Sequence, residues 1–327
     1  MGLEIAGTTV DRGSKSTGFL EVGRNADNTP VGLPYIIVNG KKDGPIVEVD
    51  SSVDGDEPDG VDAILRLAKT VRPEALRGTL ILIPVVNPPA YLAAQRLSPL
   101  DGLRMGSLYP GDNNGRISER LAYAHFNEFV KGADYVITCH CGGGGNVLRN
   151  FIIAPSLDVG KVALQSLEFA KASGIPIINQ VEKSEDPGTL LVQAPKRGIK
   201  VVMPEIDTEA RAKDVEKVYQ CIVNLLRSLR MLEGNPVLPK KQVVARCNFV
   251  VRPNRMGLWQ PIKQVGDRVT RGELVGRFLD PFTGDDVQRL ESEFDGIVSQ
   301  HASRAVVTPS VISVYAGGPV VEEIENG

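Results

Sequence analysis

The chain has 327 residues, with 37 basic and 40 acidic side chains and a formal net charge of -3 at neutral pH. This near balance gives no electrostatic basis for binding nucleic acid or an anionic membrane, so a small-molecule ligand is the expected partner. Hydrophobic residues make up 42% and charged residues 24%, as in ordinary globular proteins. The length accommodates one large domain with an appendage, or two domains.

The N-terminal sequence "MGLEIAGTTVDRGSKSTG" has no apolar run that would serve as a signal peptide. No stretch of about 18 consecutive apolar residues, the length needed to cross a bilayer, occurs anywhere in the chain. The sequence therefore predicts a cytoplasmic protein.

The first two thirds of the chain alternate apolar strands with amphipathic helices. After an N-terminal part at 1–44, with short strands near 18–22 and 35–38, the predicted strands lie at 46–49, 79–86, 135–139, 150–154, 175–178 and 200–206. The predicted helices lie at 61–71, 118–131, 164–172 and 210–231. This alternation predicts the α/β class, with an open mixed sheet flanked by helices. In such sheets, sites collect beyond the carboxyl ends of the strands.

The sequence changes character at 233–242, a polar segment with two prolines that we take as a domain boundary. We thus expect an α/β domain at 1–236 and an all-β module at 237–327. In that module, "VGDRVTRGELVG" and "FDGIV" resemble the flattened barrel of biotinyl and lipoyl carrier domains. The intervening "LDPFTGDDVQRLES" lacks the lysine that carriers modify, so the resemblance implies the fold and not the attachment. An exposed β edge also favours a homo-oligomer.

The three histidines differ in their surroundings. His125 lies in the middle of a predicted helix and His301 in the C-terminal module, and both are interpreted as structural. His140 ends the apolar strand "ADYVITC" and precedes a run of glycines, which places its ring at the carboxyl edge of the sheet. His140 is therefore the candidate for chemistry.

Carboxylates follow two other predicted strands. Asp54 and Glu57 lie three residues apart at a strand-to-helix turn, and Glu205 lies near the end of "KVVMPEI". A carboxylate at the end of a buried strand is costly unless a metal, a partner or a function compensates it. We expect Asp54, Glu57 and His140 to form a three-ligand metal site with an open position for water. Glu205 would stand opposite and accept a proton from that water.

Four stretches together resemble a known family. They are "GPIVEVDSSVDGDEPDGVDAILRLA", "LILIPVVNPPAYLAAQRLSPLDG", "YPGDNNGRISERLAYAHFNEFVKGADYVITCHCGG" and "VVMPEI". In order and spacing they resemble the succinylglutamate desuccinylase and aspartoacylase family, whose members often carry a similar C-terminal β module. The resemblance implies an α/β core like that of zinc carboxypeptidases and hydrolysis of the amide of N-acyl amino acids. It also implies zinc held by a His-x-x-Glu pair and a later histidine.

Carried over by position, the resemblance assigns roles to five residues. Glu57 matches the metal-binding glutamate, His140 the later histidine and Glu205 the catalytic glutamate. Arg96 matches the arginine that polarises the scissile carbonyl and stabilises its oxyanion. Asp54 stands where the family has its first histidine, so "HGDE" has become "DGDE".

The aspartate at position 54 admits several interpretations. As a ligand it makes the site harder and more anionic, so that zinc remains the first expectation while manganese, iron or cobalt become acceptable. The leading hypothesis is then a metal-dependent amidohydrolase of the deacylase type. Alternatively the metal is lost and the protein is a non-catalytic binding protein, or the altered site hydrolyses a different small amide or ester.

A second departure concerns substrate binding. The segment "RMGS" at 104–107 stands where the family has Asp-Leu-Asn-Arg, so the residues that would grip a substrate carboxylate are Gly106 and Ser107. Serine does not replace the bidentate contact of an arginine. We expect Arg104 or Arg149 to supply it, with Ser107 nearby; the alternative is that both are ordinary surface arginines.

Overall fold

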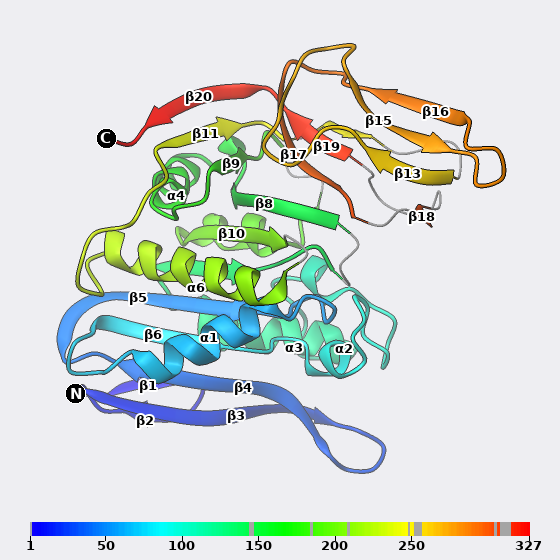
Figure 1. The fold of residues 1–327 in the computed structure, drawn as a ribbon. Helices are drawn as coiled ribbons and strands as arrows, with labels where there is room; N and C mark the ends of the chain where they lie inside the picture. Colours follow the sequence, from blue (N-terminus) through cyan, green and yellow to red (C-terminus); the bar gives the residue numbers. More distant parts are fainter. Residues whose placement is uncertain are drawn as a thin grey trace.

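The computed structural model describes residues 2–143, 147–183, 186–207, 210–247, 249–251, 257–303, 306–307 and 315–327. Among these residues a 14-stranded mixed sheet runs through the whole molecule (Figure 1). The strands up to residue 207 are β1 (Leu3–Ile5), β2 (Thr8–Val10), β3 (Ser14–Arg24), β4 (Pro30–Asn39), β5 (Lys42–Ser51), β6 (Arg77–Ile83), β7 (Tyr135–Cys139), β8 (Val147–Ala154), β9 (Ile177–Gln180) and β10 (Lys200–Asp207).

The later strands and the helices complete the element order. The strands are β11 (Lys241–Ala245), β12 (Phe249–Val251), β13 (Gly257–Pro261), β14 (Arg268–Val269), β15 (Leu274–Leu279), β16 (Asp286–Glu291), β17 (Gly296–Ala302), β18 (Val306–Val307), β19 (Tyr315–Gly318) and β20 (Val320–Glu325). The α-helices are α1 (Asp59–Thr70), α2 (Pro88–Leu92), α3 (Ile117–His125), α4 (Lys161–Lys171), α5 (Leu190–Gln193) and α6 (Arg211–Ser228). Short 3₁₀ or π turns are η1 (Met105–Ser107), η2 (Phe126–Val130), η3 (Leu157–Val159) and η4 (Pro195–Arg197).

The centre of the sheet is parallel. β5 pairs in parallel with β6 on one side and with β7 on the other, and β7 pairs in parallel with β10. The flanking strands β4 and β8 run antiparallel to β6 and β10. The mixed α/β sheet predicted from the sequence is confirmed, and its parallel strands β5, β7 and β10 end on the same edge.

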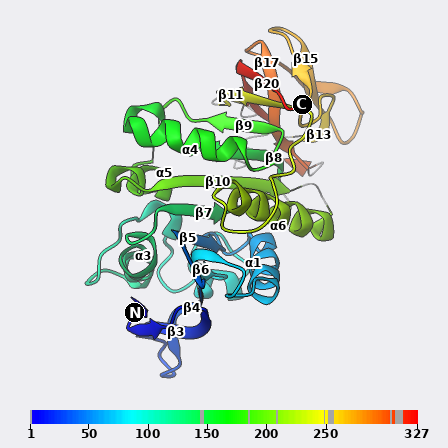
Figure 2. The ribbon, with the colours of Figure 1, turned by 90° about the vertical axis from the view of Figure 1, so that its left-hand side faces the viewer.

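Helices cover both faces of this sheet (Figure 2). Side chains of α1, α4 and α6 form one core with residues such as Val49, while α3, η2 and α5 form a second core with residues such as Ile81. Because successive side chains of a strand point to opposite faces, Val47 and Val49 of β5 enter the first core. Glu48 and Asp50 of the same strand therefore point toward the face that α3 covers.

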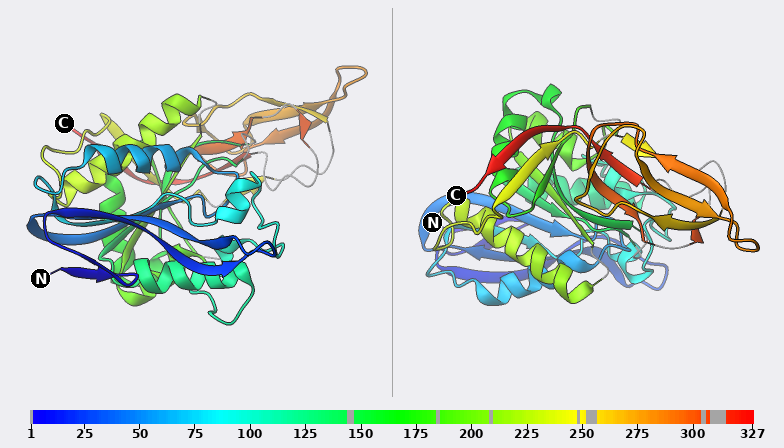
Figure 3. Two further views of the ribbon diagram at one scale, coloured as in Figure 1. Left: turned by 90° about the horizontal axis from the view of Figure 1, so that it is seen from below. Right: turned by 45° about the horizontal axis from the view of Figure 1, so that its top comes forward.

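The C-terminal part continues the main sheet. β11 pairs in parallel with β9, and β17 pairs antiparallel with β8. A separate sheet of order β16-β15-β13-β18 has its own core, which includes Trp259 and Phe278. The hairpin of β15 and β16, drawn in orange, extends away from the α/β body (Figure 3). The division at residue 236 and the likeness to carrier domains stay predictions.

Most predicted boundaries differ from the structure by a few residues, and three of the differences have a clear local cause. β6 ends at Ile83 and not at 86 because Pro84 follows it, and β9 starts at Ile177 because Pro176 has no N–H to donate. The helix predicted over 118–131 is α-helical to His125 and continues as a π turn, η2, whose wider register keeps both of its phenylalanines buried. Within the described residues, no helix is both long and apolar enough to span a membrane.

Candidate active site

The residues predicted to form the site come from three neighbouring strand ends. Asp54 and Glu57 follow β5, His140 follows β7, and Glu205 lies in β10. His140 and Glu205 are paired across a parallel bridge, in which the His140 N–H donates to the Pro204 carbonyl at 2.9 Å. The sheet itself therefore fixes the spacing between the imidazole and the Glu205 carboxylate.

Asp54, Glu57 and His140 form a compact set of buried donors. One ligand atom from each lies within 4.8 Å of the others. The Nδ1 atom of His140 is 2.7 Å from Glu57 Oε2, which also accepts the Cys141 N–H at 3.2 Å. Burial disfavours the imidazolium form, but the Glu57 carboxylate outweighs this and raises the pKa of His140 to about 9.

Asp54 is also the partner of two arginines. Arg104 donates from Nε to Asp54 Oδ1 at 3.1 Å and from Nη2 to Oδ2 at 2.9 Å, and Arg96 Nη2 lies 3.3 Å from Oδ2. Although burial opposes ionisation, the Arg104 hydrogen bonds and the charges of His140 and Arg96 hold the pKa of Asp54 below its usual value. The Asp54 carboxylate is therefore ionised, and both Arg104 and Arg96 form ion pairs with it.

The glycine at position 106 makes room for this arrangement. A Cβ atom there would lie 3.3 Å from a Val53 methyl, 3.6 Å from Arg104 Nη2 and 3.7 Å from Asp54 Oδ1. A longer side chain would therefore compete with the Arg104 guanidinium for this space. Ser107 accepts a hydrogen bond from Arg104 Nη1 at 3.3 Å and donates its own to Asp186. The residues at the two departures noted in the sequence, at 54 and at 106–107, all lie against the Arg104 side chain.

Glu205 is held by Arg149. The Arg149 Nη1 atom donates to Glu205 Oε2 at 2.6 Å and to the Cys141 carbonyl at 3.3 Å, while its Nε donates to Gln300 Oε1 at 3.1 Å. Burial raises the pKa of Glu205 above its ordinary value, although the Arg149 charge opposes that rise. Arg149 is thus no surface arginine, and it links the site to β17.

A cavity of about 120 Å³ joins these residues. Its lining combines charged groups with apolar side chains from α5 and β10, and includes Val53, Glu57, Arg96, Arg104, Gly106, Tyr109, Thr138, His140, Arg149, Thr189, Leu190, Leu191, Met203 and Glu205. Every arginine singled out in the sequence contributes to it. Ser107 lies behind Arg104 and not in this lining.

The sequence analysis assigned no role to Tyr109, Thr138 or the acidic residues Glu48 and Asp50 of β5. Tyr109 and Thr138 line the cavity, and their hydroxyl groups contact His125 and Asp50. The available signal was the segment "VEVDS", in which two acidic residues at every second position interrupt an otherwise apolar central strand.

Comparison with known proteins identifies the family to which the chain belongs. Residues 43–229 match the family model described as the succinylglutamate desuccinylase/aspartoacylase catalytic domain. The class defined by this match and by the relatives below is that of hydrolases acting on carbon–nitrogen bonds other than peptide bonds. The chain belongs to the succinylglutamate desuccinylase/aspartoacylase family, as its sequence resemblance implied.

Individual relatives extend the likeness beyond that domain. The chain is 27% identical over 295 residues to the N-alpha-acetyl-L-2,4-diaminobutyric acid deacetylase of Halomonas elongata, covering 86% of this chain and 85% of that protein. A succinylglutamate desuccinylase/aspartoacylase structure from Rhodobacter sphaeroides superposes with a TM-score of 0.83 at 25% identity, over 96% and 98% of the two chains. The ectoine utilization protein EutE (DoeB) from Ruegeria pomeroyi shares the fold, with a TM-score of 0.83 at 22% identity over 95% and 96%.

Proposed function

We propose that the protein is a deacylase that hydrolyses the amide of an N-acyl amino acid or a related small amide. The observation that carries this proposal is the convergence of Glu57, His140, Glu205 and three arginines on one small cavity. A carboxylate oxygen of Asp54 lies within 4.8 Å of the donor atoms of Glu57 and His140. The name of the Halomonas elongata relative, a deacetylase of an N-acetylated amino acid, supports this type of substrate.

The donor residues fit a divalent cation in type and in convergence. Asp54, Glu57 and His140 would hold it, with zinc as the first choice and manganese, iron or cobalt made acceptable by the second carboxylate. When bound, such a cation polarises the scissile carbonyl and lowers the pKa of water. Arg104 and Arg96 compete for the Asp54 charge, so the affinity of the site depends on them.

Glu205 is suited to move the proton. Its buried carboxylate, kept in place by Arg149, accepts a proton from the attacking water and returns it to the leaving nitrogen. Burial raises its pKa and so strengthens it as a base, while the adjacent guanidinium keeps it ionised.

The arginines divide the remaining roles. Arg96, which is about one-third exposed at the cavity, stabilises the oxyanion that develops on the carbonyl. Arg104 and Arg149, with Ser107 supporting Arg104, orient the substrate through hydrogen bonds from their remaining N–H groups. The small volume of the cavity favours a short acyl group.

The first test is a substrate screen. N-acyl amino acids, simple amides and simple esters are incubated with the protein and added zinc, manganese, cobalt or iron. For a substrate that is turned over, Glu205→Gln is expected to lower kcat by about 10²- to 10⁴-fold because it removes the base. Glu74→Gln, at an exposed glutamate, is the matched control and leaves kcat unchanged. A Glu205→Gln protein with kcat within about twofold of the wild type contradicts the assigned base.

Metal removal tests the donors. Chelation, or the change Glu57→Gln, is expected to abolish turnover, and adding back the metal restores activity only to the chelated wild type. Asp54→His recreates the His-x-x-Glu pair and is expected to raise zinc affinity, measured by calorimetry. Full activity of a chelated protein shown to be metal-free excludes metal dependence.

A further inference from the structure

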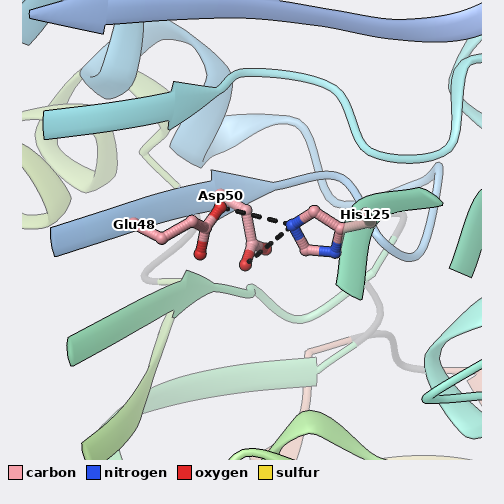
Figure 4. Close-up of side chains that lie close together, drawn as sticks. All are labelled: Glu48, Asp50 and His125. Atoms are coloured by element: carbon pink, nitrogen blue, oxygen red, sulfur yellow. Dashed lines mark hydrogen bonds and ion pairs between the residues drawn. The ribbon is translucent and has the colours of Figure 1, made fainter. Parts of the chain in front are cut away.

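A second group of titratable side chains lies beneath the cavity, outside the residues assigned so far. Glu48 and Asp50 of β5 and His125 of α3 are completely buried. Figure 4 shows the three side chains pointing toward one another, with one ring nitrogen of His125 facing both carboxylates. One donor atom from each lies within 4.8 Å of the other two.

The charges of this group are not balanced. Within the described residues, the ion pairs formed by Glu48 and Asp50 are both with His125. One oxygen of each carboxylate, Glu48 Oε2 and Asp50 Oδ2, is buried without a hydrogen-bond partner. One imidazole cannot balance two buried carboxylates, and burying the two unpartnered oxygen atoms costs several kcal/mol, so either protons or a cation must neutralise the remaining charge.

Direct hydrogen bonds satisfy only part of this group. His125 Nε2 forms a hydrogen bond of 3.3 Å with Glu48 Oε1, but it lies 3.9 Å from Asp50 Oδ2, which is too long for a hydrogen bond. Two ligands bound at about 2.0–2.2 Å to one metal ion lie about 3.0–3.5 Å apart. Glu48 Oε1 already lies at this separation from His125 Nε2, and a small inward movement of Asp50 brings its Oδ2 atom to it as well.

The outer contacts also resemble those around metal ligands. His125 Nδ1 is 2.9 Å from the Tyr109 hydroxyl, which accepts its N–H when Nε2 carries the lone pair. Asp50 Oδ1 accepts a hydrogen bond from Thr138 Oγ1 at 2.8 Å. The imidazole and one carboxylate are thus oriented by second partners, which leaves the unpartnered oxygen atoms free to bind.

We propose that Glu48, Asp50 and His125 bind a divalent first-row transition cation, separate from the active-site donors. Two carboxylates and one imidazole suit Mn²⁺, Fe²⁺ or Zn²⁺. The ion ties α3 to β5 and, through Tyr109 and Thr138, fixes two side chains that line the active-site cavity.

The test counts metal in a protein whose active-site donors are disabled. Glu57→Gln removes one of those donors and leaves the Glu48 cluster intact. After incubation with Mn²⁺ or Zn²⁺ and desalting, the folded Glu57→Gln protein is expected to retain about one metal ion per chain, measured by elemental mass spectrometry. Because this variant lacks a proposed active-site ligand, its result does not depend on the proposed function.

A second substitution tests whether the retained ion is bound by the Glu48, Asp50 and His125 cluster. Adding Glu48→Gln in the same background removes a charge at constant volume and is expected to lower the metal content below about one tenth of an ion per chain. Glu74→Gln in that background is the control and is expected to retain the ion. A folded Glu57→Gln protein that retains no metal overturns the proposal and assigns protons to the cluster, as does full retention after Glu48→Gln.

Tyr109→Phe covers the case in which Glu48→Gln fails to fold. It deletes only the hydroxyl group that contacts His125 Nδ1. In the Glu57→Gln background, Mn²⁺ affinity is then expected to fall about 10- to 100-fold, as measured by titration calorimetry. Unchanged affinity overturns the proposal.

Discussion

Asp54 stands at the position where the resemblance places the first histidine of the family. Its carboxylate faces His140 and Glu57 on one side and accepts hydrogen bonds from Arg104 on the other. A histidine in this position would not attract two guanidinium groups. The change from histidine to aspartate thus brings the arginines into the first contacts of the proposed metal site.

Removing the competing arginine is expected to strengthen metal binding. Arg104→Gln removes the charged hydrogen bonds of Arg104 to both oxygens of Asp54, each worth about 1.5–3 kcal/mol, while Arg96 keeps its ion pair with Oδ2. The association constant for zinc or manganese should rise by roughly tenfold or more, measured by calorimetry on the chelated protein. Arg116→Gln, at an exposed arginine that pairs with Glu119, is the control. Weaker binding in Arg104→Gln would mean that Arg104 positions Asp54 for the metal.

The sequence predicted which residues of the site lie close together where their backbone positions in the sheet determine the contact. His140 and Glu205 end adjacent parallel strands, and strand alternation alone puts them on one face. The partners of Asp54 could not be derived in the same way, because Arg104 reaches it from a loop through a flexible side chain. Glu48 was missed because its partner His125 lies 77 residues later, on a helix whose orientation the sequence does not reveal.

At the scale of elements, the turn from β5 to α1 is held by close packing against α2. A Cβ atom at Gly55 would lie 2.0 Å from the carbonyl carbon of Ala90 and 2.3 Å from the Tyr91 nitrogen. Since both contacts are backbone atoms of a helix that starts with two prolines, the helix has little freedom to move away. The position of Asp54 therefore depends on a glycine beside it.

Gly55→Ala is expected to destabilise the protein and to weaken metal binding together. The clash forces the turn or α2 to shift, with a loss of about 2–4 kcal/mol in the free energy of unfolding. Denaturant unfolding and metal titration measure the two effects. Gly132→Ala, where an added Cβ has no neighbour within 4 Å, is the matched control. Equal stability of the two variants would show that the turn adapts.

Elements were predicted best where apolar periodicity is strong. The central strands and α1, α4 and α6 lie within a few residues of their expected ranges, and prolines account for the boundaries of β6 and β9. The short helices α2 and α5 gave no periodic signal, because four or five residues complete little more than one turn. Leu190 and Leu191 of α5 line the cavity, and α2 packs against the turn at Gly55, so these parts of the site were harder to predict than the strand ends.

At the scale of the whole molecule, one sheet crosses the predicted domain boundary. Phe151 and Ile177 of the α/β part share a small core with Ala245 and Ile297 of the C-terminal part. The pairing of β9 with β11 and of β8 with β17 covers strand edges that would otherwise be exposed. The sequence signalled a change in character at 233–242 but not this shared pairing, since strand partners are set by long-range contacts.

A fragment ending at residue 236 tests the independence of the two parts. We expect it to aggregate or to unfold without cooperativity, because β8 loses its pairing with β17, β9 loses its pairing with β11, and Phe151 becomes exposed. Circular dichroism and thermal unfolding provide the measurement. Shortening the exposed hairpin tip at 281–284 in the full chain is the control and should leave the melting temperature unchanged. A cooperative fragment with the native melting temperature would establish two independent domains.

The contact between Arg149 and Gln300 joins residues 151 positions apart. During synthesis, a ribosome adds Gln300 long after the strands that carry His140 and Glu205 have emerged. Until then Arg149 lacks one of the side chains that orient it, and β8 and β9 lack their C-terminal partner strands. We therefore expect the cavity to be completed last, and a prematurely terminated chain to lack the contact that Gln300 makes with Arg149.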